Sequence, residues 1–207
     1  MDQLELTWHG HSCFQVTLKG YTIVIDPYED GAVPGLSPLN LSAHQVICSH
    51  DHHDHNASHL VSSLPKTSCP FQIKKVLTFH DSQQGSQRGN NIIHILESRN
   101  LRIAHFGDLG CSLNSQQLFA LGKLDAAMIP VGGFFTINPE EAKSLLDILQ
   151  PKVILPMHYR SDTFGYPQLA TVDEFLELTG GGFYYPGNSI SIHPCSKPHV
   201  AVLTYQG

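Results

Sequence analysis

A dense run of histidine and aspartate occupies residues 50–55, which read His-Asp-His-His-Asp-His. Imidazole nitrogens and carboxylate oxygens together suit zinc, manganese or iron. In an extended or tightly turning backbone, His50 and His52 point the same way and can reach one ion, whereas Asp54 and His55 then face a second ion. The run is internal, follows an apolar segment and contains carboxylates, which disfavours a solvated histidine tract or a purification tag. It therefore predicts a metal site.

Three further candidate ligands each follow a short apolar segment downstream of this run. His80 comes after Thr78-Phe79, Asp108 lies in a turn bracketed by glycines, and His158 comes after Met157. A lone histidine at the end of a strand is more often a surface or hydrogen-bonded residue than a ligand. Three such positions after a histidine-rich run favour one shared metal site instead.

Short strands alternating with helices are expected to position these residues. Segments rich in β-branched, aromatic and aliphatic residues predict strands at residues 4–8, 13–18, 21–25, 46–48, 75–79, 92–97, 101–104, 126–130 and 153–156, with edge strands between residues 183 and 204. Helices are predicted at residues 56–64, 113–121, 139–149 and 172–178. No linker or low-complexity segment divides the chain, so residues 1–207 are expected to form one α/β domain of two sheets covered by helices.

Composition narrows the class of protein further. Apolar residues make up 41% of the 207 residues and charged residues 14%, which is typical of a globular domain. The net charge is −6 and the 12 basic residues are scattered, which disfavours a nucleic-acid partner. A metal site explains the 14 histidines better than a core does.

The cysteines and the N-terminal segment indicate in which cellular compartment the protein is expected. The five cysteines have no paired spacing, and Cys48, close to the histidine-rich run, is expected to be a small buried residue. The N-terminus lacks the basic and apolar regions of a signal peptide, and no apolar run has the length of a membrane helix. We expect free thiols, a cytoplasmic location and no association with a membrane.

Several motifs along the chain resemble the metallo-β-lactamase superfamily, in which a histidine-rich motif is followed by single histidine, aspartate and histidine ligands. More narrowly, the chain resembles the compact bacterial metal-dependent hydrolases related to L-ascorbate-6-phosphate lactonase. The matching segments are residues 8–14 (WHGHSCF), 25–27 (IDP), 49–55 (SHDHHDH), 105–108 (HFGD), 130–133 (PVGG), 135–136 (FT) and 156–159 (PMHY). The resemblance implies an αββα four-layer sandwich.

The resemblance also implies a set of ligands for two divalent ions, with zinc favoured and manganese as the alternative, since the related lactonases are associated with manganese. One ion would be held by His50, His52 and His80, the other by Asp54, His55 and His158, and Asp108 would bridge the two.

The roles of three other residues near these motifs, His105, Asp26 and His11, are less clear from the sequence. As the third histidine ligand we prefer His80 to His105, and we expect His105 to pack in the core or to support a ligand. Asp26 either orients a ligand through a hydrogen bond or only ends a strand. His11 either contacts substrate or a metal-bound group, or ties a hairpin to the core.

The expected function is that of a metal-dependent hydrolase. Two metal ions would activate a water or hydroxide for attack on a small ester, lactone or phosphoester, and Asp54 would act as the catalytic carboxylate. One alternative is a phosphodiesterase or nuclease acting on nucleic acid. Another is a non-hydrolytic metal-binding or redox protein, although a di-iron redox relative would normally carry glutamate at the position of His52.

The sequence predicts a small-molecule substrate but does not identify it. Arginine side chains near the ligands could bind a phosphate or carboxylate. The candidate substrate-binding residues are His11, Arg88, Thr136, Tyr159 and Arg160. No sequence pattern decides whether the protein forms a homo-oligomer.

Overall fold

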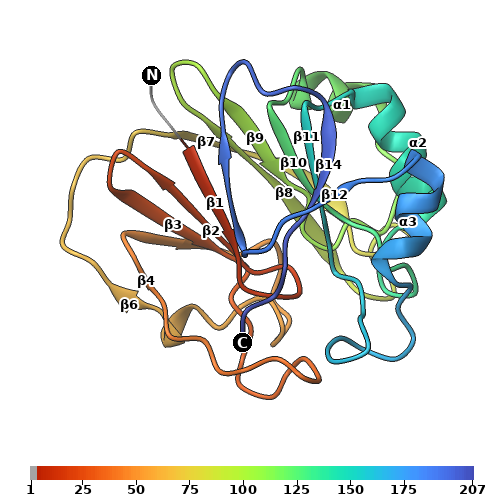
Figure 1. Ribbon diagram of the computed structural model, residues 1–207, viewed down its shortest axis with the longest axis horizontal. Coiled ribbons are helices and arrows are strands. Elements are labelled where there is room, and N and C mark those ends of the chain that lie inside the picture. The colour runs from red at the N-terminus through yellow and green to blue at the C-terminus, as the bar shows by residue number, and fades with distance from the viewer. Residues whose placement is uncertain (1–3) are drawn as a thin grey trace.

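The computed structural model describes residues 4–207, in which two β-sheets pack face to face (Figure 1). The smaller sheet has the strand order β13-β1-β2-β3-β5, with bounds Leu4–Trp8 (β1), Phe14–Leu18 (β2), Tyr21–Ile25 (β3), Gln45–Ile47 (β5) and Ser189–Ile192 (β13). The larger sheet has the order β12-β14-β11-β10-β9-β8-β7, with bounds Gln72–Phe79 (β7), Asn90–Glu97 (β8), Arg102–His105 (β9), Ala126–Pro130 (β10), Val153–Met157 (β11), Phe183–Tyr184 (β12) and His199–Val202 (β14).

Alternating apolar residues form the smaller sheet. Strands β1, β2 and β3 pair in antiparallel fashion, so that Phe14 lies between Trp8 and Ile25. The turn between β2 and β3 uses Lys19-Gly20, both with positive φ (52° and 77°), which suits a two-residue hairpin. Strand β5 then pairs in parallel with β3 and places Ile47 beside Ile25. This pairing delivers the histidine-rich run to one end of the sheet.

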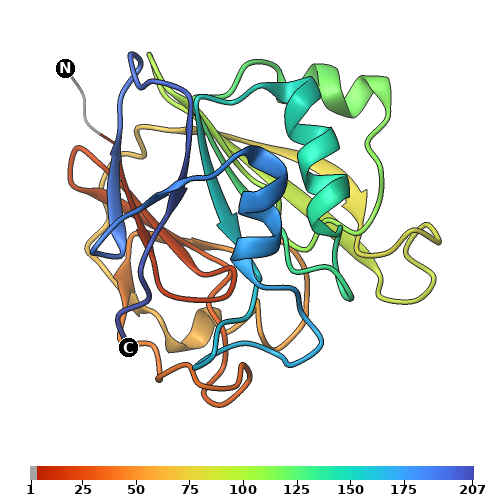
Figure 2. The ribbon, with the colours of Figure 1, turned by 45° about the vertical axis from the view of Figure 1, so that its right-hand side comes forward.

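The larger sheet is mixed and is buried on both faces. Strands β7, β8 and β9 are antiparallel neighbours, whereas β9, β10, β11 and β14 run parallel. All five residues of β10 are buried, as expected when other layers cover both faces of a sheet. Figures 1 and 2 show helices α1 (Ser115–Leu121), α2 (Pro139–Leu149) and α3 (Val172–Thr179) on the outer face of this sheet. The predicted α/β fold of two packed sheets with flanking helices is confirmed, and α1, α2 and α3 all lie on the larger sheet (Figure 1).

Loops form the outer layer on the smaller sheet. Val24 of β3 points away from the main core and packs against the loop that follows β3. A single 3-10 turn, η1 (Ser58–Leu60), and a two-stranded pair, β4 (Ser42–Ala43) with β6 (Ser62–Ser63), lie in the same layer. The second apolar cluster formed here contains Cys13, Val24, Tyr28, Val33, Leu36, Ala43 and Val61.

Two predictions about elements were wrong. The helix expected at residues 56–64 is the turn η1 followed by β6. Its backbone N–H groups bond to other segments instead: Ala57 donates to Pro27, Ser62 to Leu41 and Leu64 to Ala43. The tail was expected to supply only edge strands, yet β14 lies between β11 and β12 because its apolar residues pair into the buried parallel sheet.

None of the helices in residues 4–207 has both the length and the apolar composition required to cross a bilayer.

Candidate metal centre

Strand ends from both sheets bring the predicted ligands together. The histidine-rich run follows β5 of the smaller sheet, and His80, Asp108 and His158 follow β7, β9 and β11 of the larger sheet. Since β9 and β11 run in the same direction on either side of β10, Asp108 and His158 emerge at the same edge. The site therefore lies where the ends of the two sheets meet.

A first group of possible ligands consists of His50, His52 and His80. One ring nitrogen of each lies within 4.8 Å of a ring nitrogen of the others. The His50 ring centroid is 4.5 Å from that of His52 and 4.7 Å from that of His80. Three imidazoles at this spacing can hold one divalent ion. The predicted grouping of these three histidines is thus present in the geometry.

A second group consists of Asp54, His55 and His158 together with His11, and its ligand atoms also lie within 4.8 Å of one another. The ring centroids of His11 and His158 are 4.0 Å apart, and His11 Nε2 lies 3.4 Å from Asp54 Oδ2. The structure therefore places His11 beside the predicted ligands. The His11 carbonyl also accepts hydrogen bonds from Trp8 Nε1 and from the N–H of His158, so the residue ties the hairpin to this site as well.

Asp108 lies between the two groups. Its Oδ2 atom is 3.1 Å from His158 Nε2, 3.2 Å from His55 Nε2 and 3.3 Å from His80 Nε2. His50 Nε2 is farther away, at 4.0 Å. The carboxylate thus faces histidines of both groups, which is the position predicted for a bridging ligand.

Several inner donor atoms lack hydrogen-bond partners within residues 4–207. His55 Nδ1 donates to Asp26 Oδ2 at 2.9 Å, and His50 Nδ1 lies 2.9 Å from Ser49 Oγ, whereas Nε2 of both rings has no hydrogen-bond partner. Asp108 Oδ1 is likewise buried and unpaired. Each unpaired buried polar atom costs about 1–3 kcal/mol. Outer nitrogens fixed by the protein and inner nitrogens left free are what metal-binding histidines require, so these residues fit a metal ion.

The ionisation of the site suits cation binding. Burial, followed by the proximity of His55, lowers the pKa of His50 to about 3, so that its ring is neutral at pH 7. Burial and the nearby His158 lower the pKa of His11 to about 4. Burial would raise the pKa of Asp108, but His158 and His55 outweigh it and hold that pKa well below its usual range. The site therefore offers neutral His50 and His11 rings beside a carboxylate anion. Burial would lower the pKa of His55, but Asp108 and Asp26 outweigh it and raise that pKa well above its usual value.

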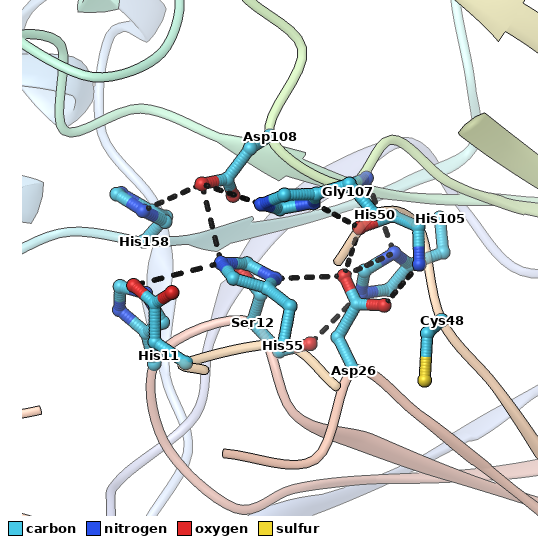
Figure 3. Close-up of polar contacts among 12 residues, drawn as sticks. His11, Ser12, Asp26, Cys48, His50, His55, His105, Gly107, Asp108 and His158 are labelled. Atoms are coloured by element: carbon cyan, nitrogen blue, oxygen red, sulfur yellow. Dashed lines mark hydrogen bonds and ion pairs between the residues drawn. The ribbon is translucent and has the colours of Figure 1, made fainter. Parts of the chain in front are cut away.

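Asp26 contacts the second group through a hydrogen bond from His55. It is fully buried, and its carboxylate accepts hydrogen bonds from the N–H and Oγ–H of Ser49. It also accepts a hydrogen bond from His55 Nδ1 (Figure 3). Burial alone would raise the pKa of Asp26, but the bond from His55 and the neighbouring His105 lower it to about 2. Of the two roles left open by the sequence, the hydrogen bond to His55 fits the one in which Asp26 orients a predicted ligand.

His105 uses both of its ring nitrogens within the core. Its Nε2 donates to the carbonyl of Ser12 at 2.8 Å, and its Nδ1 accepts from the N–H of Gly107 at 3.1 Å. Burial lowers the pKa of His105. A neutral ring with neither nitrogen free cannot bind a metal, which agrees with the packing role expected for it.

A cavity of about 370 Å³ opens over the two groups. Its lining includes Asp54, His80, Asp108 and His158 of the two groups, together with His52, His53, Arg88, Phe135 and Tyr166. A volume of this size suits a small molecule.

The architecture and the site agree with a match to a family model. The model described as the beta-lactamase superfamily domain matches residues 5–158. The chain belongs to the metallo-β-lactamase superfamily. That match covers all seven predicted metal ligands.

Several similar proteins are described as metal-dependent hydrolases. A UPF0173 metal-dependent hydrolase of Enterococcus faecalis is 26% identical over 227 residues, covering 91% of this chain and 100% of the relative. One from Caldivirga maquilingensis is 25% identical over 205 residues, covering 84% and 88%. The crystal structure of a proposed zinc-dependent hydrolase of the metallo-β-lactamase superfamily from Thermotoga maritima is 35% identical, with a TM-score of 0.80 and coverage of 98% and 100%. The protein is accordingly a metal-dependent hydrolase of this superfamily.

Three residues expected at the substrate lie away from the cavity of this hydrolase. Tyr159 is buried and stacks on Trp8 with ring centroids 5.5 Å apart. It follows the bend at His158, whose φ is 54°, directly after β11. Arg160 donates from Nε to the carbonyl of Leu169 and borders a separate pocket. Thr136 donates to the carbonyl of Ile137.

Tyr166 is a cavity residue that the sequence did not indicate. Its hydroxyl lies 2.8 Å from the carbonyl oxygen of Ala32 and 3.3 Å from Asp54 Oδ2. The residue belongs to the segment between β11 and α3, which folds back over the site. A Gly-Tyr-Pro sequence shortly after His158 was the one available signal, and it is equally typical of an ordinary loop.

Replacing Asp26 with asparagine is expected to weaken metal binding by about 10–100-fold, the usual effect of losing a group that orients a histidine ligand. The amide would present an N–H group to His55 or Ser49 where both now donate. Competition with a chromogenic chelator measures the dissociation constants. Asp30→Asn, in the exposed loop after β3, is the matched control. Equal affinities of Asp26→Asn and the parent protein would contradict this role.

Proposed function

We propose that this hydrolase cleaves a small ester, lactone or phosphoester at a centre of two divalent ions, with zinc as the favoured metal and manganese as the alternative. One observation carries the proposal: two adjacent groups of histidine and aspartate side chains face Asp108, and His50 Nε2 and Asp108 Oδ1 among them are buried without a hydrogen-bond partner. Lactones enter through sequence resemblance alone.

The assignment of ligands follows the two groups. His50, His52 and His80 would hold one ion, and Asp54, His55 and His158 the other, with Asp108 between them. When bound, two such ions lower the pKa of a water and polarise the oxygen of the bond to be cleaved. Asp26 fixes the proton of His55 on Nδ1 and so leaves Nε2 available.

The chain's own contribution to proton transfer lies at Asp54. Its Oδ2 faces the cavity between His11 Nε2 at 3.4 Å and the Tyr166 hydroxyl at 3.3 Å. This carboxylate can orient a water and accept its proton, and it can then pass that proton to the leaving group. Phe135 and Tyr166 also line the cavity, with their ring centroids 5.6 Å apart.

The size and charge of the site favour a small substrate over nucleic acid. A cavity of about 370 Å³ accommodates a metabolite-sized molecule. Arg88 is the one arginine or lysine that lines it in the described part of the chain. A strand of nucleic acid needs a row of such cations along its backbone. The five cysteines are free, two of them exposed, and on this basis we place the protein in the reducing cytoplasm.

Metal analysis followed by a substrate panel tests the proposal. Elemental analysis of the purified protein should find two zinc or manganese ions per chain. Loaded protein should hydrolyse at least one member of a panel of carboxylic esters, lactones, phosphomonoesters and phosphodiesters, and a chelator should stop the reaction. Tightly bound iron with redox activity and no hydrolysis would overturn the proposal.

A further inference from the structure

Arg88 presents an unpaired cation to the cavity. Its guanidinium lies 5.7 Å from the centre of the Phe135 ring. Across residues 4–207 this guanidinium forms no hydrogen bond and no ion pair. Arg102 differs, because it pairs with Glu97 and donates to two backbone carbonyls. The cation of Arg88 is therefore available to a ligand.

The loop that carries Arg88, residues 80–89 between β7 and β8, is held by a single buried carboxylate. Asp81 Oδ1 accepts the N–H groups of Gln83 and Gly85 at 2.8 and 3.0 Å. Its Oδ2 accepts those of Gln87 and Arg88 at 3.0 and 2.8 Å. Four donors saturate the carboxylate, and the contact to Arg88 uses its backbone, so the guanidinium is left free.

Backbone contacts close the same loop at its base. The N–H of His80 donates to the carbonyl of Gly89 at 3.0 Å, and the N–H of Gly89 donates to the carbonyl of Gly85 at 2.9 Å. A Cβ at Gly85 would come within 2.9 Å of the Gly89 carbonyl oxygen, and its φ is +80°. A loop fixed in this way orders the backbone at Arg88 before a ligand arrives, which lowers the entropic cost of binding.

We propose that Arg88 is an anion subsite of the substrate cavity and that Asp81 is its positioning residue. The proposal rests on the hydrolytic function proposed above and narrows its substrate to a small ester that carries a carboxylate or phosphate away from the bond cleaved. A guanidinium supported on an aromatic face binds either group through paired hydrogen bonds. Arg88 also borders the neighbouring pocket beside His52, Leu77 and Ile92, so the rest of such a substrate can extend past it.

Kinetics with a matched pair of esters test the proposal. The p-nitrophenyl monoester of succinic acid keeps one carboxylate, and its methyl ester is neutral. On metal-loaded protein, Arg88→Gln should lower kcat/KM for the anionic ester about tenfold or more, through KM, the size expected of one charge-assisted contact. The neutral ester should change less than about twofold. Arg88→Lys should fall between, and Arg99→Gln, at an exposed turn, should behave like the parent protein.

The variant Asp81→Asn tests whether Asp81 positions Arg88 or only stabilises the folded protein. It should raise KM for the anionic ester with kcat and metal content retained, because the amide nitrogen faces two N–H donors and displaces the loop. Inhibition by monomethyl succinate and by inorganic phosphate, compared between the parent protein and Arg88→Gln, shows which anion the subsite prefers. Equal losses on both esters in Arg88→Gln, or inhibition that does not depend on Arg88, would overturn the subsite. Absence of metal-dependent hydrolysis of any ester would instead refute the proposed function.

Discussion

Replacing Asp54 with asparagine is expected to lower kcat by about 10²–10⁴-fold, the range typical of losing a general acid–base, while most of the metal stays bound. Oδ2 of Asp54 lies within 3.4 Å of His11 Nε2, within 3.3 Å of the Tyr166 hydroxyl and 3.9 Å from His55 Nε2, at the cavity wall. An asparagine keeps the shape and one ligand oxygen. It has no charge and cannot accept the proton of a water, so turnover should suffer far more than metal affinity.

The measurement compares kcat, KM and metal content of Asp54→Asn with those of the parent protein. Asp30→Asn removes the same charge from an exposed loop outside the site and serves as the control. Full activity in Asp54→Asn would refute the assignment of Asp54. Loss of activity together with loss of metal would show that Asp54 acts chiefly as a ligand.

The ligand positions could be predicted because each one marks the end of a recognisable strand. Short apolar segments before His80, Asp108 and His158 predicted β7, β9 and β11, and the structure contains all three. Strands of one sheet that run in the same direction end at a common edge, which brings residues distant in sequence together. The seven residues of the predicted set consequently lie in one cluster.

The substrate side of the cavity was harder to predict because tertiary packing determines it. Local sequence does not show that the segment after β11 folds back to place Tyr166 beside Asp54. Nor does it show that Tyr159 turns into the core against Trp8. Arg88 lines the cavity from the β7–β8 loop, whose backbone N–H groups donate to the carboxylate of Asp81. In each case the deciding contact lies in a loop without periodic pattern.

The same limit explains the wrong helix at residues 56–64. The serines at 58, 62 and 63 and the asparagine at 56 offer the backbone alternatives to a helix. Hydrogen bonds to Pro27, Leu41 and Ala43 from segments far away in sequence then decide the conformation. The error left the ligands in place, since His50 to His55 precede that segment.

Removing the metal is expected to abolish hydrolysis and to lower the melting temperature. Without ions, the buried inner atoms of His50, His55 and Asp108 remain unpaired. A ligand present at 1,000 times its dissociation constant stabilises the folded state by about 4 kcal/mol. For a chain of this size each kcal/mol corresponds to about 2–4 °C, so chelation should lower the melting temperature by about 8–16 °C. Thermal denaturation of loaded and chelated protein measures the shift.

Variants at two histidines separate specific binding from general effects of the chelator. His50→Gln removes a proposed ligand, so its melting temperature should respond much less to chelation than that of the parent protein. His59→Gln alters an exposed histidine of η1 that belongs to neither ligand group, and it should respond like the parent protein. Re-addition of zinc or manganese should restore both stability and hydrolysis, because both ions accept imidazole and carboxylate ligands. If chelated protein kept its activity and its melting temperature, these buried histidines would have to be structural, and the hydrolytic centre would lie elsewhere.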